Sequence, residues 1–480
     1  MLSNLLKQGM HYASGTLLLS VASLISFPIL TRFLPVDQYG MLSLLTTLAG
    51  IIVAVYKFGL QQSIIRYFKK SDDVFNTSVL YAMSISLLAV SVMLVLFYLC
   101  FNTDISYQYF YSLLLISVFQ ACRSVVISNY AASEKSIYVN GINVIYKYLS
   151  LFAMLLFIFY YERSAISVLF SMLAIDGLIA AAIMFNWFKT FKLTKPDTET
   201  IKTLFIYGSP LMLAELVQMA HAFADRFMIE HYLGLEQVAM YVAPYSMSKI
   251  ISDIVFGGLA TALVPIYMGM WNRQEHNNVS LLLKKASDYY VLLFPVTIGG
   301  LYLIAESLIG LAASEKYTQT AFIMPIAFIG VGLFSSTFIY SAGLRIRKNQ
   351  TAILRYATES LLLNVTLNYI FMPMFGIVAS AWATVASYAW MSLRFYRASQ
   401  ATVNVPINLN NLVTGSLIAG VLIILSDVLP SHQHYAVELS IRLVLGGSIA
   451  VSMLLVLNKG LRTDLSQAVS FIKQKFCKSN

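Results

Sequence analysis

Long apolar segments alternate with short polar breaks along almost the whole chain. Each segment is close to the ~20 residues that a helix needs to cross the ~30 Å hydrocarbon layer of a bilayer. Since lipid offers no hydrogen-bond partner to an exposed backbone amide, such segments cross it as helices. The pattern predicts about fourteen helices, over residues 12–33, 40–66, 77–101, 105–132, 137–160, 165–188, 201–230, 238–267, 280–305, 318–344, 350–373, 376–398, 408–429 and 436–457.

The composition supports the same fold class. Hydrophobic residues make up 58% of the chain and charged residues 11%, whereas a soluble globular domain has about 25% charged residues. We therefore expect an all-α polytopic integral membrane protein. The first apolar segment has no small-x-small cleavage site and leads directly into the second, so we expect a retained helix instead of a signal peptide.

The basic residues indicate the orientation of the chain in the membrane. The net charge is +10, and a cytoplasmic amino terminus places most Lys and Arg residues in loops on the cytoplasmic side. This asymmetry follows the positive-inside rule and predicts that both termini are cytoplasmic. We expect the basic tail, residues 458–480, to lie near anionic lipid headgroups. Nucleic acid is therefore not an expected partner.

The three cysteines, Cys100, Cys122 and Cys477, lie far apart in the sequence and form no CxxC pair. This spacing predicts neither a metal site nor a disulfide framework.

A polar decapeptide occurs twice. RFLPVDQYGM, Arg32–Met41, returns as HYLGLEQVAM, His231–Met240, with Leu, Gln and Met in register. Six predicted helices separate the copies, so both halves enter the membrane in the same direction, as in a parallel repeat related by an axis along the membrane normal. We therefore predict two six-helix lobes and two further helices, with boundaries at 1–195, 196–402, 403–457 and the tail 458–480.

Three stretches carry a resemblance to a known family. LTRFLPVDQYGMLSLLTTL, DRFMIEHYLGLEQVAMYVAPYSMSKI and LNVTLNYIFMPMFGIVASAWATVASY resemble the polysaccharide-export branch of the multidrug/oligosaccharidyl-lipid/polysaccharide (MOP) exporter superfamily. The best-known members of this branch are the Wzx-type flippases for O-antigen and related polysaccharides. In the third stretch, Asn364, Asn368 and Gly376 stand as the family has them.

The resemblance implies both an architecture and an activity. It implies two lobes around a central cavity, and alternating access that moves a lipid-linked oligosaccharide from the cytoplasmic to the outer leaflet of a bacterial inner membrane. The last two helices are implicated in a lipid-facing groove for a polyprenyl tail. Expected partners are the lipid-linked oligosaccharide, membrane lipids, and polysaccharide polymerase and chain-length proteins.

Ionisable residues inside the predicted helices are the main functional signal, because each costs ~2.5–3.5 kcal/mol to insert and usually faces a cavity or a partner. A cation in a cavity can bind a diphosphate, and an Arg side chain does so with two parallel hydrogen bonds. The intramembrane charges are Lys57, Arg123, Lys147, Asp176, Glu215, Asp225, Arg226, Lys249, Asp253 and Glu359. We predict Lys57, Arg123 and Lys249 as substrate-binding cavity cations, with Lys147 and Arg226 as further candidates.

Structural interpretations of the same residues remain open. Lys249 and Asp253 are four apart on one helix face and can neutralise each other. Arg226 lies near the outer end of its helix, from which it can snorkel to the interface. Lys147 and Glu359 occupy matching depths and can pair with each other.

Carboxylates are candidates for ion coupling, because no G-x-x-x-x-G-K-[ST] loop or other nucleotide motif is present. We therefore expect no cofactor and a proton or sodium gradient as the energy source. Glu215, which follows Pro210, is the first candidate, and Asp225 and Asp253 come next. Glu215 as a hydrogen-bonded contact between helices is an equal alternative. His221 in the same helix titrates near neutrality when exposed.

The repeated decapeptide predicts the outer gate. Its two copies are expected to form the outer turns that must separate when cargo leaves. Arg32 and Asp37 are the predicted gate residues, and Arg32 is always charged whereas its counterpart His231 is not.

Two other transport functions and one enzymatic function compete with this prediction. A multidrug or cation antiporter of the same superfamily would favour an acidic cavity. A flippase for lipid-linked peptidoglycan precursors would share the anionic cargo. A membrane enzyme would need catalytic groups on a large extramembrane loop, and the predicted outer loops are short. We therefore expect a protein that is not an enzyme.

Overall fold

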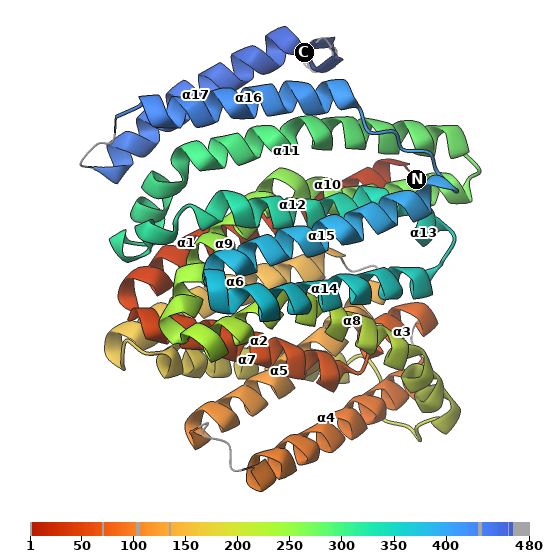
Figure 1. The fold of residues 1–480 in the computed structure, drawn as a ribbon. Coiled ribbons are helices and arrows are strands. Elements are labelled where there is room, and N and C mark those ends of the chain that lie inside the picture. Colours follow the sequence, from red (N-terminus) through yellow and green to blue (C-terminus); the bar gives the residue numbers. More distant parts are fainter. Residues whose placement is uncertain are drawn as a thin grey trace, which may run out of the picture. The chain divides into compact units, whose positions relative to one another are not determined.

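The computed structural model of the 480-residue chain describes residues 2–69, 72–101, 106–133, 136–430, 434–458 and 460–463. Within these ranges every regular element is a helix and none is a strand, so the predicted all-α class is confirmed (Figure 1). The predicted tail beyond residue 463, with Cys477, lies outside the described residues. The elements are α1 (Leu2–Phe33), α2 (Val36–Lys57), α3 (Leu60–Tyr67), α4 (Asp73–Phe101), α5 (Tyr107–Ala132), α6 (Ser136–Tyr160), α7 (Ala165–Phe188), α8 (Thr198–Leu233), α9 (Leu235–Ser252), η1 (Asp253–Gly257), α10 (Gly258–Asn272), α11 (His276–Ala312), η2 (Glu315–Thr320), α12 (Ile323–Tyr340), α13 (Ala342–Ile346), α14 (Gln350–Phe375), α15 (Ile377–Gln400), α16 (Leu409–Val428) and α17 (Tyr435–Leu457).

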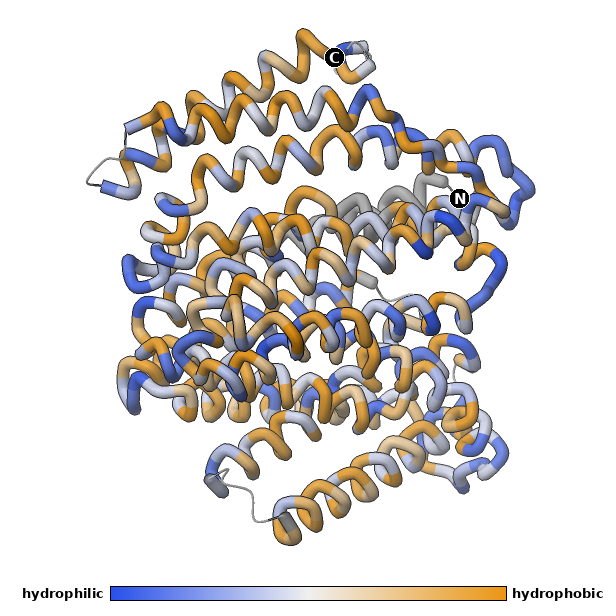
Figure 2. Tube along the Cα trace, in the orientation of Figure 1, coloured by the Kyte–Doolittle hydropathy of each residue, from blue (hydrophilic) through white to orange (hydrophobic). Residues whose placement is uncertain are grey.

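Many of these helices suit a bilayer. Among the described residues, 10 helices are long and apolar enough to cross a membrane: α2, α4 to α8, α11, α12, α16 and α17. In Figure 2, α4 is hydrophobic along most of its length. Its side chains include Leu88 and Leu99, which are 69% and 65% exposed. Because no protein covers them, lipid must. The chain is a multi-pass membrane protein, as predicted.

The predicted helix 40–66 is broken near its carboxyl-terminal end. α2 stops at Lys57, and α3 starts at Leu60. Phe58 and Gly59 between them have φ values of 46° and 69°, a left-handed conformation that cannot continue a right-handed helix. A Cβ atom on Gly59 would overlap the carbonyl of Gly208 in α8, so only glycine allows this approach. The break thus fixes the end of α2 against α8.

Two other predicted helices are also divided. The segment 238–267 consists of α9, the π-helical turn η1 and α10, and the segment 318–344 consists mainly of α12 and the short α13. A π-helical turn accommodates an extra residue within a helix and is frequent at functional sites.

The chain divides into two compact units. Unit 1 contains Met1–Val242 and Leu354–Ala383, and unit 2 contains Ala243–Ile353 and Thr384–Asn480. These units reflect packing and not a repeat, so the predicted lobes, 1–195 and 196–402, remain a prediction.

In unit 1, a hydrophobic core joins α3, α4, α5, α7 and α8. Ile64, Phe75, Val125, Trp187 and Leu204 are at most 2% exposed there. This core holds the α2–α3 break and the first half of α8 in place.

The start of α8 is capped by a side chain outside the apolar segment. The Asp197 carboxylate accepts hydrogen bonds from the backbone N–H groups of Glu199 and Thr200, which a helix cannot satisfy internally. The Thr200 hydroxyl also donates to it, and this hydrogen bond is the main reason that the pKa of Asp197 lies below its usual value.

In unit 2, α11 packs closely against α16 and α17, which lie side by side with it in Figure 1. A Cβ atom on Gly299 of α11 would overlap Ala419 of α16, and one on Gly415 would overlap the Leu292 carbonyl. Small residues of this kind let membrane helices approach closely. In α17, the buried Arg442 forms an ion pair of 2.8 Å with Glu438.

The repeated decapeptide forms a helix–turn–helix at both places. α1 passes into α2 through Pro35, with φ −55°, and α8 passes into α9 through Gly234, with φ +87°. The turns therefore differ at the one position where proline replaces glycine. The two copies also meet, because a Cβ atom on Gly40 would overlap the carbonyl of Leu235.

Candidate substrate and ion-coupling site

Two predicted site residues from distant parts of the sequence form one ion pair. Lys57 Nζ, at the end of α2, lies 2.6 Å from Glu215 Oε1 in α8. The side chains are only 9% and 24% exposed. The predicted cavity cation and the first ion-coupling candidate therefore neutralise each other in this structure.

Neutral side chains complete this pair. Gln61 in α3 donates to Glu215 Oε2 and accepts from Lys57 Nζ, each at 3.4 Å. Ser124 in α5 donates to Gln61 Oε1 at 3.1 Å. Gln61 reaches the pair because the break after α2 turns α3 toward α8. Since Gln61 contacts both charges, it can support either of them when the ion pair opens. Sequence analysis missed Gln61, which carries no charge.

Glu215 lies within an unbroken helix. α8 continues through Pro210, although proline removes one backbone donor and usually kinks a helix. The carboxylate lies on the side of α8 that packs against α2 and α3. Its position thus depends on the contact between Gly59 and Gly208 described above.

Arg123, another predicted cavity cation, has a buried acidic partner. Its Nη2 lies 3.7 Å from Asp176 Oδ1, and its guanidinium stacks 3.6 Å from the ring centroid of Tyr146. Gln120 and the Tyr146 hydroxyl donate to Asp176 Oδ2 at 2.8 and 3.3 Å. The charge of Arg123 is therefore compensated within α5, α6 and α7. Sequence analysis identified Asp176 as an intramembrane charge, and its depth, similar to that of Arg123, was the available signal for the pairing.

The Arg226 guanidinium donates hydrogen bonds only to neutral groups, although the adjacent Asp225 carboxylate also attracts it electrostatically. Its Nη1 donates to Ser43 Oγ at 3.0 Å and Thr47 Oγ1 at 3.1 Å, both in α2. Its guanidinium carbon lies 4.7 Å from the centre of the Phe223 ring. Among the described residues it makes no ion pair. Its side chain points to α2, so the predicted snorkelling is not the arrangement seen.

Asp225, beside Arg226, is held by a tyrosine. Its Oδ2 accepts a hydrogen bond of 2.7 Å from the Tyr241 hydroxyl, and its Oδ1 accepts from the backbone N–H of Arg226. The side chain is 3% exposed. One turn earlier, His221 Nε2 lies 2.7 Å from the Ser360 hydroxyl. Both predicted titratable residues are thus buried in hydrogen-bonded positions.

Lys147 and Glu359 do not pair with each other. Glu359 accepts a hydrogen bond of 3.0 Å from Arg355 on its own helix, α14. Lys147 is half-buried on α6, and within the part of the chain that the structure describes it makes no hydrogen bond or ion pair. The alternative that these two residues pair is therefore not the arrangement seen, and an arginine one turn away on the same helix is a partner of Glu359.

In unit 2, Lys249 and Asp253 form the pair that their spacing allows. Lys249 Nζ lies 2.9 Å from Asp253 Oδ2, and the side chains are 57% and 47% exposed. The pair stands at the junction of α9 and η1. Its predicted roles in substrate binding and ion coupling remain predictions.

The predicted gate residues lie at the first decapeptide turn. Arg32 is exposed at the end of α1. Asp37, in the first turn of α2, accepts a hydrogen bond of 2.9 Å from Gln38, whose Oε1 accepts from the backbone N–H of Ala165. The turn is therefore tied to the start of α7.

Comparison with known proteins identifies related sequences. Residues 5–271 match the family described as "Polysaccharide biosynthesis protein". The chain is 21% identical over 199 residues to Agl15 of Haloferax volcanii, a probable low-salt glycan biosynthesis flippase. This match covers 41% of the chain and 42% of Agl15, so it spans less than half of that relative.

Solved structures share the fold. The lipid II flippase MurJ in an inward closed conformation has a TM-score of 0.77 at 13% identity, over 94% of this chain and 99% of that one. An outward-facing multidrug resistance transporter of the MATE family has a TM-score of 0.59 at 12% identity, over 83% and 94%. A MOP superfamily transporter from Pyrococcus furiosus has a TM-score of 0.55 at 13% identity, over 81% and 95%. The predicted resemblance to the MOP superfamily is confirmed.

Proposed function

This chain belongs to the polysaccharide biosynthesis protein family, and from this membership we propose that it is a flippase for polyprenyl-diphosphate-linked oligosaccharide repeat units. These would be the units of O-antigen, capsule or a related surface polysaccharide. The chain would move them from the cytoplasmic to the outer leaflet by ion-coupled alternating access. It would act as a transporter and not as an enzyme.

The Lys57–Glu215 ion pair is the observation that carries this proposal. While Glu215 is ionised, Lys57 is neutralised and has little attraction for an anionic cargo. A proton or sodium ion on Glu215 removes that competition and frees Lys57 for a phosphate oxygen. When the diphosphate leaves, Glu215 can release its ion and pair with Lys57 again. Cargo and coupling ion are thereby linked at one position.

Arg226 supplies a second anion position along the same two helices. It lies eleven residues after Glu215 in α8, which is about 16 Å at 1.5 Å per residue. Its partners Ser43 and Thr47 are neutral, so a diphosphate can replace them without breaking an ion pair. The bidentate geometry of Arg suits phosphate. In the predicted topology, Arg226 is closer to the outer face than Lys57, which gives the cargo an outward sequence of contacts.

The arrangement disfavours a multidrug or cation antiporter as the alternative. An organic cation would need an accessible, uncompensated carboxylate, whereas Glu215 and Asp176 each face a basic side chain and Asp225 is buried against the Tyr241 hydroxyl. A flippase for lipid-linked peptidoglycan precursors uses the same anionic chemistry and differs in the sugar. Measuring transport of cargo lipids that carry either sugar head distinguishes these two functions.

The proposal includes a cellular setting. We place the chain in a bacterial cytoplasmic membrane with both termini in the cytoplasm, driven by a proton or sodium gradient without a bound cofactor. Polysaccharide polymerase and chain-length proteins are its proposed protein partners.

Transport in reconstituted vesicles tests the proposal. The cargo is a short-chain polyprenyl-diphosphate-linked sugar with a fluorescent label, and its arrival in the opposite leaflet is read by dithionite quenching. The transport rate of the parent protein should change when a proton or sodium gradient is imposed. Glu215→Gln should lose that response, and Arg226→Ala should lose most transport while remaining inserted.

Matched controls come from an exposed ion pair outside this site. Arg273→Ala and Glu275→Gln alter a pair of 2.7 Å with side chains 42% and 34% exposed. Both controls should transport like the parent. A gradient response retained by Glu215→Gln would refute the coupling role, and transport retained by Arg226→Ala would refute the second anion position.

A further inference from the structure

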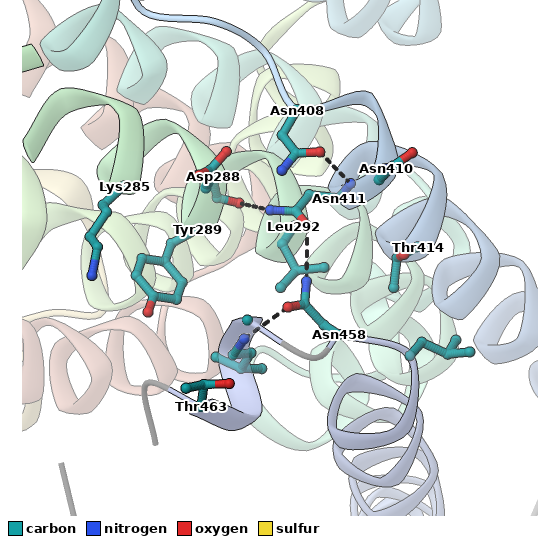
Figure 3. A pocket seen from close by; sticks show the side chains of 13 residues that line it. Lys285, Asp288, Tyr289, Leu292, Asn408, Asn410, Asn411, Thr414, Asn458 and Thr463 are labelled. Atoms are coloured by element: carbon teal, nitrogen blue, oxygen red, sulfur yellow. Dashed lines mark hydrogen bonds between the residues drawn. The ribbon is translucent and has the colours of Figure 1, made fainter. Parts of the chain in front are cut away.

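A polar pocket of about 670 Å³ lies within unit 2, between the start of α16, the end of α17 and the first half of α11 (Figure 3). Four carboxamide side chains contribute to its wall, those of Asn408, Asn410, Asn411 and Asn458. None of them takes part in the charge pairs described above. In the predicted topology, all three helix ends at this pocket are cytoplasmic.

Hydrogen bonds from the carboxamides join the three helices, as the dashed lines in Figure 3 show. Asn411 Nδ2 donates to the backbone carbonyl of Asp288 at 3.1 Å. Asn458 Nδ2 donates to Asn411 Oδ1 at 2.9 Å, and Asn458 Oδ1 accepts from the backbone N–H of Leu461 at 2.8 Å. The wall is therefore held in place before any ligand arrives, as in most small-molecule sites.

The pocket keeps unused hydrogen-bonding capacity of both kinds. A carboxamide has two N–H donors and an oxygen with two lone pairs, and Asn411 and Asn458 each use only part of these. The side chains of Asn410 and Thr414 make no hydrogen bond within the described ranges.

This mixture of donors and acceptors selects among ligands. A sugar hydroxyl donates and accepts at once, so it can satisfy both the N–H groups and the oxygen of an Asn side chain such as that of Asn410. A phosphate only accepts, so it can use Lys285 and the carboxamide N–H groups of the wall but leaves the carboxamide oxygens without a donor. The chemistry of the wall therefore favours a sugar over a phosphate.

The surroundings of the pocket favour a sugar that is attached to a lipid. Leu409 and Val413, on the first turns of α16, are 67% and 56% exposed, and Val456 near the end of α17 is 71% exposed. An apolar surface thus borders the polar pocket on both helices. A ligand with a sugar head and a hydrocarbon tail would meet both surfaces.

We propose that this pocket binds the sugar of a membrane glycolipid, and that it loads the glycan of the cargo before transport. The inference rests on the proposed function for the identity of that glycolipid. In this proposal the pocket binds the sugar in a loading step, and Lys57 and Arg226 bind the diphosphate in the later transport step.

Binding to the full-length protein in detergent tests the pocket by native mass spectrometry. The probes are monoglucosyl diacylglycerol, phosphatidylglycerol with the same acyl chains, and methyl glucoside. The test protein carries Asn410→Leu together with Thr414→Val, and both single variants are also measured. Asn404→Leu, at an exposed asparagine that does not line the pocket, is the control.

The glucolipid should bind the parent and the control equally, and the double variant about tenfold more weakly, since two hydrogen-bonding groups are lost. Phosphatidylglycerol binding should not change, and methyl glucoside should bind much more weakly than the glucolipid. Equal glucolipid binding by parent and double variant would overturn the inference. So would a parallel loss of phosphatidylglycerol binding, which indicates a phosphate site, or methyl glucoside binding as tight as that of the glucolipid.

These results are separate from the transport test. If the pocket variant binds the glucolipid like the parent while Arg226→Ala loses transport, the sugar-binding role of the pocket is refuted and the proposed flippase function is retained. If glucolipid binding depends on the pocket but the parent does not transport the diphosphate-linked sugar, the proposed function is refuted and the glycolipid-binding site is retained.

Discussion

Removing the two charges of the Lys57–Glu215 pair, singly and together, separates a structural role from a functional one. Glu215→Leu leaves Lys57 with a charged side chain that is only 9% exposed. Breaking a buried pair from one side costs about 3–5 kcal/mol. Because the Glu215 side chain is 24% exposed and Gln61 remains a partner of Lys57, we expect the free energy of unfolding to fall by about 3 kcal/mol, the lower end of that range.

The other two variants complete the cycle. Lys57→Met leaves the more exposed carboxylate with Gln61 as a hydrogen-bond donor, so we expect a loss of about 2 kcal/mol, the scale of a hydrogen bond to a charged group. The double variant replaces both charges by apolar side chains of similar size. Its free energy of unfolding should lie within about 1 kcal/mol of the parent value.

Stability and transport should then diverge. Unfolding in mixed micelles with increasing dodecyl sulfate measures the free energies, and the vesicle assay measures transport. We expect the double variant to regain stability without regaining transport, because it lacks Lys57, the first of the two cations proposed to contact the diphosphate. A double variant that transports like the parent would show that the pair only joins helices. A Glu215→Leu variant as stable as the parent would refute the buried pair itself.

Two further predictions concern the ends of α2 and α8. Gly40→Ala adds a methyl group that overlaps the Leu235 carbonyl, so the two decapeptide turns must separate. A cysteine introduced at Ser43 should then react several-fold faster with an impermeant maleimide. The control is Gly141→Ala, which has open space around it and should leave that reaction rate unchanged. Asp197→Asn keeps a side chain that can cap the helix but removes the negative charge of a carboxyl group whose pKa is lowered in the folded chain. The stabilisation from that charge is present above the unfolded pKa of about 3.9 and disappears as the pH falls through the lower folded pKa. The midpoint of thermal unfolding should therefore differ between parent and variant at pH 6 and converge toward pH 3, and a pH-independent difference would contradict this origin.

The helices could be predicted closely because each long apolar segment has to satisfy its own backbone in lipid. The segment 165–188 coincides with α7. The break at Phe58 and Gly59 was not predicted, since both residues sit in a segment that is apolar enough to continue. The break follows from the close approach of Gly208, which is distant in the sequence.

The candidate site was predictable in its residue types and not in its pairings. Lys57 was selected from its depth in one helix and Glu215 from its position after Pro210 in another, whereas the pairing of Lys249 with Asp253 was expected from their spacing on one helix face. Local spacing sufficed for the second pair, because both residues belong to one helix. The first pair joins residues 158 positions apart, and no local pattern specifies which helices will be neighbours.

The sequence by itself determined that this chain lies in a membrane, that it is helical, and that a polar turn occurs twice, because hydropathy and backbone hydrogen bonding act locally along the chain. The tertiary structure decided which cations are compensated. It pairs Lys57 and Arg123 with carboxylates, whereas the hydrogen bonds of the Arg226 guanidinium go to hydroxyl groups. The physical reason is that the state of a buried charge depends on the rotation and packing of neighbouring helices, which only the folded chain defines.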